Sequence, residues 1–226
     1  MTLTKYGIME WGLAFIINAV LIALCWMFLR KYSIVATWIL TVFFTIVFLA
    51  IAAFFRNPIR HIPTNANFLV SPADGTVRDI EVVEDFEQSP FTGEALRIGI
   101  FLSVFNVHVN RACADFQVDT VSYREGEYLD ARHAECAKRN EAMTISGTAS
   151  LCGKDFPMAI RQISGAIARR IVCPVQAGQK LRKGQIYGMI KFGSRTEIYL
   201  PKDQFELKVK IGDKVRGGES IIAEIK

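Results

Sequence analysis

Two stretches of this chain, VQAGQKLRKG at residues 175–184 and VKIGDKVRGG at residues 209–218, share one pattern, with the second starting 34 residues after the first (209 − 175). Each begins with valine, has glycine at its fourth and tenth positions, and carries an apolar residue between two basic ones. Glycine at matching positions is typical of tight turns, because it adopts backbone angles that other residues avoid. The repeat therefore predicts two copies of one turn-strand unit, packed against each other.

The chain from Asn67 onward has the composition of a β protein. Short β-branched or alternating runs lie between turns rich in Gly, Pro, Asp and Asn, as strands do. We expect a mainly β protein with a little α: a barrel/sandwich-hybrid-like β domain preceded by a two-helix transmembrane hairpin. A short helix or polar loop is expected at residues 127–139, and a helical turn at residues 166–170. The expected strands are residues 76–83, 97–103, 104–111, 116–123, 142–150, 156–163, 185–192, 197–200, 206–209 and 220–225.

The N-terminal segment has the pattern of a membrane hairpin. Residues 11–29 form an uncharged apolar run of 19 residues, and residues 34–55 form another of 22. At a rise of about 1.5 Å per residue, each helix crosses most of a hydrocarbon layer about 30 Å thick. A cleaved signal peptide is disfavoured, because two runs follow each other and no small-residue cleavage site is present. We expect a membrane hairpin at 1–55, a linker at 56–66 and a β domain at 67–226.

Charge and cysteine content narrow the classes of partner. The five cysteines form no CxxC pair and no metal-ligand spacing, so we expect reduced, mostly buried thiols and no metal site. A net charge of +5 on a membrane-tethered domain favours an anionic lipid surface over nucleic acid, for which the sequence has no motif. We predict a cell (inner) membrane protein whose C-terminal domain faces the cytoplasm. The candidates for a lipid-facing basic surface are Arg161, Arg169, Arg170, Lys180, Arg182 and Lys183.

Three separate motifs supply a reactive combination of side chains. Gly193 and Ser194 follow a strand-like run, Asp74 lies in the SPADG motif, and His108 lies in an apolar run. A serine becomes a nucleophile when a base takes its proton and a third group orients that base. Ser194 could attack the Gly193 carbonyl, with His108 as the base and Asp74 holding the imidazole tautomer. Each residue alone is more simply a loop serine, a core histidine or a turn aspartate. Their co-occurrence in one small domain favours the catalytic interpretation.

The repeat also resembles the pseudo-symmetric sandwich of biotinyl and lipoyl carrier domains. The segment MIKF at residues 189–192 is close to a biotin-acceptor hairpin, so an exposed Lys191 would be a swinging-arm site. That hairpin normally has methionine directly before its lysine, whereas Ile190 intervenes here. A solvated lysine on an edge strand is the simpler interpretation. A membrane-anchored carrier modified at Lys191 and a non-catalytic assembly module remain as alternatives.

Taken together, SPADG at 71–75, FNVHVNR at 105–111 and KFGSR at 191–195 resemble the phosphatidylserine decarboxylase family in its short, membrane-tethered bacterial form. The three motifs occur in the family's order, and the resemblance covers nearly the whole chain. It implies autocatalytic serinolysis at Gly193-Ser194, which makes the chain a zymogen. The products would be a β chain of residues 1–193 and an α chain of residues 194–226, held together as a heterodimer.

The resemblance also implies the chemistry of the mature protein. Ser194 would become a covalent pyruvoyl cofactor that forms a Schiff base with phosphatidylserine from the bilayer. Loss of carbon dioxide would give phosphatidylethanolamine, a step of phospholipid biosynthesis. Asp74 and His108 would be the other catalytic residues, and we expect His108 also to protonate the α-carbon. Longer members have a second histidine where this chain has Phe105, so the role of that histidine here is open.

Overall fold

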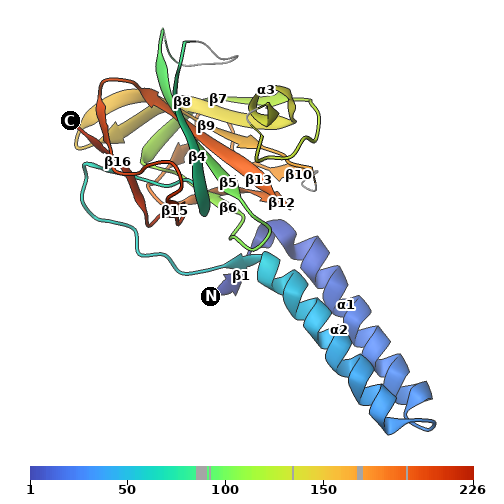
Figure 1. Cartoon of the computed structure of the whole chain (residues 1–226). Coiled ribbons are helices and arrows are strands. Elements are labelled where there is room, and N and C mark those ends of the chain that lie inside the picture. Colours follow the sequence, from blue (N-terminus) through green and yellow to red (C-terminus); the bar gives the residue numbers. More distant parts are fainter. Residues whose placement is uncertain (85–90, 92, 134, 167–169, 192) are drawn as a thin grey trace. The chain divides into compact units, whose positions relative to one another are not determined.

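The computed structural model (Figure 1) describes the whole chain except residues 85–90, 92, 134, 167–169 and 192. It divides into two compact units, Met1–Ile59 and Arg60–Lys226. The boundary between the units falls inside the expected linker. The first unit is a helical hairpin and the second is a β domain.

Two long apolar helices make up most of the first unit. α1 spans Ile8–Leu24 and continues through a π-helical turn at Cys25–Leu29, and α2 spans Ile34–Phe54. Ser33 begins α2, because its hydroxyl accepts a hydrogen bond from the Ala36 amide at 3.2 Å. The predicted pair of helices is confirmed, and both are long and apolar enough to cross a membrane.

The hairpin is closed at both ends. Near its loop, the rings of Trp26 and Trp38 pack edge to face at 5.2 Å, and Trp26 Nε1 donates to Thr41 Oγ1 at 3.2 Å. At its base, β1 (Thr2–Leu3) pairs with β2 (Arg56–Asn57) in antiparallel fashion. Ring packing and backbone hydrogen bonds therefore hold the two helices together.

An eight-stranded antiparallel sheet forms the frame of the second unit. Its strand order is β11-β7-β8-β9-β13-β5-β4-β15. These strands are β4 Gly75–Val83, β5 Ala95–Leu102, β7 Asp115–Arg124, β8 Ala142–Leu151, β9 Lys154–Ile163, β11 Lys180–Leu181, β13 Ser194–Pro201 and β15 Lys214–Val215. Nearly every residue of the neighbouring strands β5 and β13 is buried. The start of β13, at Ser194, therefore lies inside the domain.

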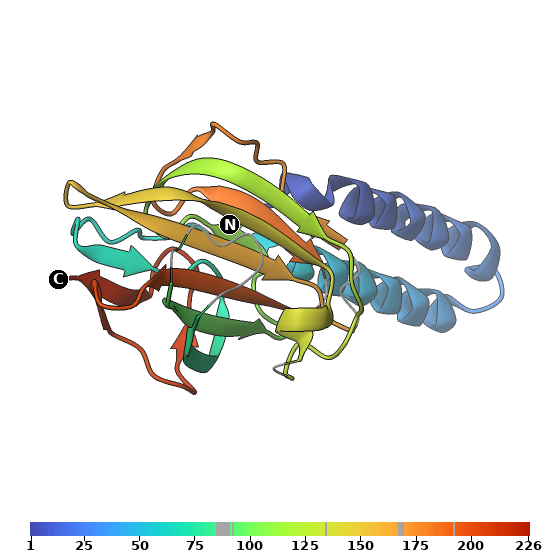
Figure 2. The ribbon, with the colours of Figure 1, turned by 90° about the horizontal axis from the view of Figure 1, so that it is seen from above.

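Two three-stranded sheets complete the β domain. Their strand orders are β10-β12-β6 and β14-β16-β3. These strands are β3 Phe68–Val70, β6 Val109–Arg111, β10 Arg170–Val172, β12 Ile186–Lys191, β14 Phe205–Leu207 and β16 Ile221–Ile225. Figure 2 shows β16, in red at the C-terminus, beside β3, in cyan. A single helical turn, α3 at Cys136–Arg139, lies within the segment expected to be a polar loop or short helix.

Alternation along the central strands separates an apolar core from a buried charged face. Ile98 and Ile100 of β5 and Ile198 of β13 are fully buried in the hydrophobic core. Because successive side chains point to opposite faces of a sheet, the intervening residues of β13 point away from this core. Arg195 and Glu197 occupy that other face and are also buried, with exposed fractions of 1% and 0%.

The two copies of the sequence repeat fold in the same way. Gly178 and Gly212 have positive φ angles of 86° and 97°, which favour glycine. Their amides donate to Val118 O at 2.7 Å and to Val77 O at 2.8 Å. The short strands that follow, β11 and β15, pair with opposite edges of the large sheet. The two predicted turn-strand units are confirmed, whereas their packing against each other stays a prediction.

One expected strand, residues 104–111, is wrong over much of its length. Only Val109–Arg111 forms β6, and the residues before it form a loop. Asn106 explains the difference, because its Oδ1 accepts hydrogen bonds from the amide and hydroxyl of Ser103 at 2.9 and 2.8 Å. Such local side-chain contacts compete with strand pairing. His108 therefore lies at the end of a loop and not inside a strand.

Other differences from expectation concern short elements. The expected helical turn at 166–170 lies largely outside the described residues, and its last residue, Arg170, begins β10. The sequence also did not predict β3 and β10, which have three residues each, and gave no bounds for the repeat strands β11 and β15, which have two each. Elements of that length are too short to show a period of two.

Candidate active site

Gly193 and Ser194 connect the small sheet that contains β12 to the large sheet. Gly193 has a positive φ of 66° and Ser194 is the first residue of β13. The left-handed backbone angle favours glycine at 193, although a Cβ there would meet only Val104 Cγ1 at 3.9 Å. The Ser194 hydroxyl is buried and has no hydrogen-bond partner among the described residues. An unpaired buried hydroxyl is costly, and this makes it a candidate reactive group.

Sequence reasoning missed the segment that lies against this peptide. A Cβ added to Gly165 would lie 2.4 Å from the Gly193 carbonyl oxygen, so glycine is required for that close approach. Ser164 also has a buried hydroxyl without a partner in the described part of the chain. It lies one residue beyond the Ile163–Arg195 pair of β9 and β13, and this register places it alongside Ser194. A Ser-Gly pair after a strand carries no specific sequence signal, because it is common in turns.

The imidazole of His108 lies next to Gly193. The Gly193 amide donates to His108 Nε2 at 3.3 Å, and His108 Nδ1 lies 3.0 Å from Asn106 O. Because Nε2 accepts in this arrangement, Nδ1 carries the proton and donates to the Asn106 carbonyl. His108 is fully buried. The structure therefore presents a neutral imidazole whose Nε2 accepts from the amide of the residue just before Ser194.

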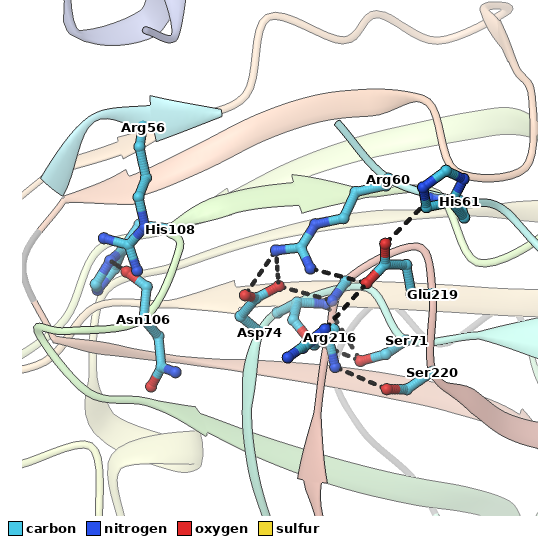
Figure 3. A network of polar contacts seen from close by, with 12 residues as sticks. Arg56, Arg60, His61, Ser71, Asp74, Asn106, His108, Arg216, Glu219 and Ser220 are labelled. Carbon is cyan, nitrogen blue, oxygen red and sulfur yellow. Dashed lines mark hydrogen bonds and ion pairs between the residues drawn. The ribbon is translucent and has the colours of Figure 1, made fainter. Parts of the chain in front are cut away.

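Asp74 belongs to a different set of contacts. Its carboxylate accepts two hydrogen bonds from Arg60, at 2.8 and 2.7 Å, and one from the Gly217 amide at 2.8 Å. Figure 3 shows the Asp74 side chain pointing to Arg60, with His108 lying apart from it. The structure thus brings His108, Gly193 and Ser194 together but does not bring Asp74 to the imidazole. Nδ1 of His108 is oriented by a backbone carbonyl instead.

Arg60 links Asp74 to a second carboxylate (Figure 3). Arg60 contacts Glu219 Oε2 at 3.2 Å, and the His61 amide donates to Glu219 Oε1 at 3.1 Å. The hydrogen bond from the His61 backbone, with a further one from Arg60, lowers the pKa of Glu219 below its ordinary value. Burial, reinforced by the charge of Arg60, lowers the pKa of Arg111. This cluster fixes the segment that carries Asp74 to the C-terminal repeat.

A second charged cluster supports β13 on its other face. Arg195 donates to Asp79 Oδ1 at 2.6 Å and to Glu197 Oε1 at 2.8 Å, and Tyr199 OH donates to Glu197 Oε2 at 2.5 Å. Burial lowers the pKa of Arg195, but the charges and hydrogen bonds of Glu197 and Asp79 outweigh it and raise the pKa overall. Sequence reasoning missed this cluster, because only the strand register shows which charges meet. It holds the strand that begins with Ser194.

A pocket of about 410 Å³ opens beside Gly193. That size falls within the range of small-molecule sites. Charged side chains from two places contribute to it, Arg78 on β4 and the Asp130–Arg132 pair. The hydrogen bonds from Arg132 lower the pKa of Asp130 to about 2. The described residues that line it are Arg78, Phe101, Ser103, Val104, Asp130, Ala131, Arg132, Ala166 and Gly193.

Two expectations about other side chains need correction. Lys191 is only 6% exposed and lies in β12, the middle strand of its sheet. It is therefore neither the exposed lysine of a carrier domain nor a solvated residue on an edge strand. Arg161 is 5% exposed and donates to Thr144 Oγ1 at 3.1 Å, so it belongs to the interior and not to a lipid-facing surface.

The cysteines and the other potential metal ligands add no site. The five cysteines are free, with Cys113 and Cys136 buried and Cys152 exposed. Burial raises the pKa of Cys113 well above its ordinary value and that of Cys136 to about 11, which makes both thiols poor nucleophiles. Within the described ranges, no three or more His, Cys, Asp and Glu side chains are grouped as a metal site would require.

A buried serine hydroxyl and a neighbouring imidazole at a strand end form a candidate nucleophile and base. A family model described as phosphatidylserine decarboxylase matches residues 47–223. The chain belongs to the phosphatidylserine decarboxylase family.

Three similar proteins are each called a phosphatidylserine decarboxylase proenzyme. The one from Rhodopirellula baltica is 43% identical over 187 residues, which cover 82% of this chain and 76% of that protein. The one from Carboxydothermus hydrogenoformans is 46% identical over 181 residues, covering 80% and 82% of the two chains. The one from Paraburkholderia phymatum is 39% identical over 216 residues and covers 95% of both chains.

Proposed function

We propose that this chain cuts itself between Gly193 and Ser194 and then decarboxylates phosphatidylserine to phosphatidylethanolamine and carbon dioxide. One observation carries the proposal: His108 Nε2 lies 3.3 Å from the Gly193 amide, beside the buried and unpartnered Ser194 hydroxyl of the described chain. The names of the relatives support both parts, because these proteins are called decarboxylases and proenzymes.

Self-cleavage needs no reagent beyond the chain and water. Ser194 Oγ attacks the Gly193 carbonyl carbon, the amide C–N bond breaks, and an ester joins the two residues. Removal of the Ser194 α-proton then breaks the bond between Ser194 Cβ and the ester oxygen. This frees the Gly193 carboxylate and leaves dehydroalanine at position 194. Water replaces its nitrogen and ammonia leaves, so that residue 194 ends as a ketone. No step changes the overall oxidation state.

His108 is the base for the first of these steps. Its Nδ1–H is held by the Asn106 carbonyl, and its Nε2 lone pair, which accepts from the Gly193 amide, must exchange that amide for the Ser194 hydroxyl to take its proton. Burial of the imidazole and of Ser194 excludes bulk water, so the serine hydroxyl meets little competition as the nucleophile. The close contact of Gly165 with the Gly193 carbonyl fixes the direction of attack.

Residue 194 fits the pyruvoyl group that the family resemblance implies. Its hydroxyl is buried and unpaired in the described structure, and it follows a glycine in a left-handed conformation. The pyruvoyl group supplies an electrophilic carbonyl that accepts the electron pair released with carbon dioxide. His108, whose Nε2 lies 3.3 Å from the Gly193 amide, delivers a proton to the α-carbon of the substrate, and the pocket beside Gly193 receives the headgroup.

After cleavage, the α chain of residues 194–226 remains part of the sheets. Its strand β13 pairs with β9 and β5, which belong to the β chain. β15 pairs with β4, and β16 pairs with β3. The two chains therefore stay together as a non-covalent heterodimer through extensive backbone pairing.

Asp74 acts as a positioning residue in this proposal. It fixes the SPADG segment through Arg60 and Gly217. In the same segment, Pro72 O accepts a hydrogen bond from the Arg111 amide at 2.8 Å. Arg111 ends β6, the strand that begins one residue after His108. Asp74 thus supports the backbone that carries the base, without touching the reacting atoms.

The apolar hairpin places the enzyme at its substrate. We propose that α1 and α2 span the cell (inner) membrane and that the β domain works on the cytoplasmic side. A lipid-facing surface would then use Arg170, Lys180 and Arg182, which are exposed, with Lys183 partly exposed. Arg169, another candidate, lies outside the described residues. Proteolysis of sealed vesicles of known orientation tests this topology: inside-out vesicles should expose the β domain to digestion.

Full-length protein purified in detergent tests the function. With phosphatidylserine labelled in its serine carboxyl carbon, the wild type should release labelled carbon dioxide. Ser194→Ala and His108→Gln should each remain a single chain on a denaturing gel and release none. A fully active Ser194→Ala variant would overturn the proposal.

Ser164→Ala is the matched control for these variants. It removes another buried hydroxyl that lacks a partner in the described chain, so the two serine variants lose the same group from neighbouring places. Ser164→Ala should cleave and decarboxylate at the wild-type rate. If it failed in the same way as Ser194→Ala, loss of activity would not identify the nucleophile, and mapping of the new N-terminus would be decisive.

A further inference from the structure

Arg78 occupies an unusual position in the pocket beside Gly193. Along β4 and β5, Val77 pairs with Ile100 and Asp79 pairs with Gly99, so Arg78 is the extra residue of a β-bulge. At a bulge, one side chain departs from the direction that the regular alternation of the strand would give it. The Arg78 guanidinium lies 5.4 Å from the centre of the Phe101 ring, and both residues line the pocket.

The two arginines of this pocket differ in their charge balance. Arg132 is neutralised by Asp130, with contacts of 2.9, 3.0 and 2.5 Å between the two side chains. Among the residues that the structure describes, Arg78 has no carboxylate partner, and its guanidinium lies over the Phe101 ring. A guanidinium over a ring keeps N–H donors on its edge available to a planar or tetrahedral anion. Of the two arginines described in this pocket, Arg78 is therefore the one whose positive charge is not balanced by a carboxylate.

We propose that Arg78 binds the phosphodiester of the phospholipid headgroup, an inference that rests on the proposed function for the choice of ligand. The headgroup carries two anions, a carboxylate and a phosphodiester. An ion pair to the carboxylate would stabilise the group that must lose its charge, and this would slow the reaction. The phosphodiester keeps its charge throughout, so binding it holds the substrate without opposing decarboxylation.

A matching bulge in strands β7 and β8 shows that the bulge itself belongs to the general fold of the domain. In β7 and β8, Val118 pairs with Gly147 and Thr120 pairs with Ser146, which leaves Asp119 at an equivalent bulge. Asp119 is not part of the pocket lining. The same kind of β-bulge thus carries Asp119 in β7 and, in β4 beside Gly193, Arg78 over an aromatic ring. The residue at the bulge, not the bulge alone, makes the site.

Direct binding to uncleaved protein tests the proposal without any need for activity. Full-length Ser194→Ala protein in detergent is titrated calorimetrically with a soluble short-chain phosphatidylserine. Adding Arg78→Gln should weaken binding by about tenfold, as expected for loss of one charge-assisted contact. Adding Arg216→Gln, which removes an arginine that is 74% exposed and does not line the pocket, should change binding less than about twofold. An unchanged affinity in the Arg78→Gln protein would overturn the proposal.

Two further arms identify the group that is bound. Inorganic phosphate should compete with the short-chain lipid in the Ser194→Ala protein and lose that effect when Arg78→Gln is added. Competition by acetate but not by phosphate would assign Arg78 to the carboxylate and contradict the proposal. Equal weakening by Arg78→Gln and Arg216→Gln would show only general attraction to anions, and would also contradict it.

Kinetics of the processed enzyme separate this inference from the proposed function. Arg78→Gln in the otherwise native chain should still cleave itself, which shows that it folds. Its KM for phosphatidylserine should rise about tenfold with kcat nearly unchanged, because a contact equal in ground and transition states is lost. If the native chain neither cleaved nor decarboxylated, the proposed function would fail, and the binding titration would still decide the role of Arg78.

Discussion

Two halves of the β domain, one around β4 and one around β7, share the same backbone contacts, but in the described part of the chain an arginine pairs with the aspartate of the β4 half alone. Val77 N donates to Asp213 O and Val118 N donates to Gln179 O, both at 2.9 Å. In each half an aspartate caps the second turn of the repeat. Asp74 Oδ1 accepts from the Gly217 amide and Asp115 Oδ1 accepts from the Lys183 amide, both at 2.8 Å.

The two halves differ in the contacts that their capping aspartates make beyond the shared backbone hydrogen bond. Asp74 binds Arg60 through both of its oxygens, whereas Asp115 contacts the backbone of Lys183. The repeat position that holds Glu219 in one half holds Gln185 in the other. The capping aspartate is therefore a requirement of the fold, and the specialised role of Asp74 lies in its clamp with Arg60.

The largest effect, on the rate of self-cleavage, is expected at Gly165, which lies against the Gly193 carbonyl. Gly165→Ala places a Cβ 2.4 Å from the Gly193 carbonyl oxygen, so this carbonyl must move. A displacement of about 1 Å at a reacting group costs about 100-fold in rate, and we expect self-cleavage to slow by at least that factor. The rate is measured as the appearance of two chains on a denaturing gel during cell-free synthesis with membranes.

Gly147→Ala is the control for Gly165→Ala. Its Cβ would lie 2.2 Å from the Gln117 carbonyl oxygen, a clash of the same kind in the β7–β8 pair. It should lower the melting temperature as much as Gly165→Ala does, yet leave cleavage near the wild-type rate. Similar loss of cleavage in both variants would mean that general destabilisation, and not the position of Gly193, limits the reaction.

The two capping aspartates should differ when each is changed to asparagine. Asp74→Asn leaves Arg60 without its closest carboxylate in a largely buried position, with side-chain exposures of 7% and 13% for the pair. We expect a loss of about 2–3 kcal/mol in unfolding free energy and roughly tenfold slower cleavage. Asp115→Asn keeps its backbone contact and should lose about 1 kcal/mol or less.

Denaturant unfolding in the Ser194→Ala background measures both stabilities in a single uncut chain, and cleavage is followed in the native background. Equal effects of the two asparagine variants on stability and cleavage would show that Asp74 is a turn cap and nothing more. Retention of normal cleavage in Asp74→Asn would contradict its positioning role.

The turn glycines should behave as equivalents. Gly178 and Gly212 both have positive φ, and a Cβ at either would meet nothing within 4 Å. Alanine at each position therefore suffers backbone strain alone, about 1 kcal/mol. Thermal melting of Gly178→Ala and Gly212→Ala should show equal shifts. Shifts that differed several-fold would contradict the equivalence of the two repeats.

The smallest effect concerns pH. The pKa of Glu219 is lowered in the folded protein, so its carboxylate stabilises the fold above its unfolded pKa of about 4.3. That stabilisation is lost as the pH falls from this value through the lower folded pKa. Glu219→Gln copies the residue of the other half and should remove this part of the acid sensitivity. Melting temperatures between pH 6 and pH 3 should therefore converge for the two proteins; a constant difference would contradict the lowered pKa.

The scaffold could be predicted further from sequence than the site could. Periodic runs and repeated glycines predicted the hairpin, most long strands and the paired turns, because those features depend on local alternation and backbone angles. His108 and the Gly193-Ser194 pair were found by their chemistry. Their adjacency required β12 and β6 to pair, which no local pattern shows.

Other features of the site depend on contacts between distant segments. The Arg60 clamp on Asp74 joins two side chains whose local sequence predicts only a linker and a turn. The approach of Gly165 to Gly193 and the bulge at Arg78 arise from strand register. Lys191 was predicted on an edge strand, because the short strand β10 that covers it has only three residues and shows no periodicity.

The intact masses of the full-length protein purified from cells show directly whether the chain cuts itself at Gly193-Ser194. We expect two chains, one ending at Gly193 and one covering residues 194–226 with a mass lower by one ammonia than its sequence requires. A single chain of 25.4 kDa with an unmodified serine at position 194 would contradict it.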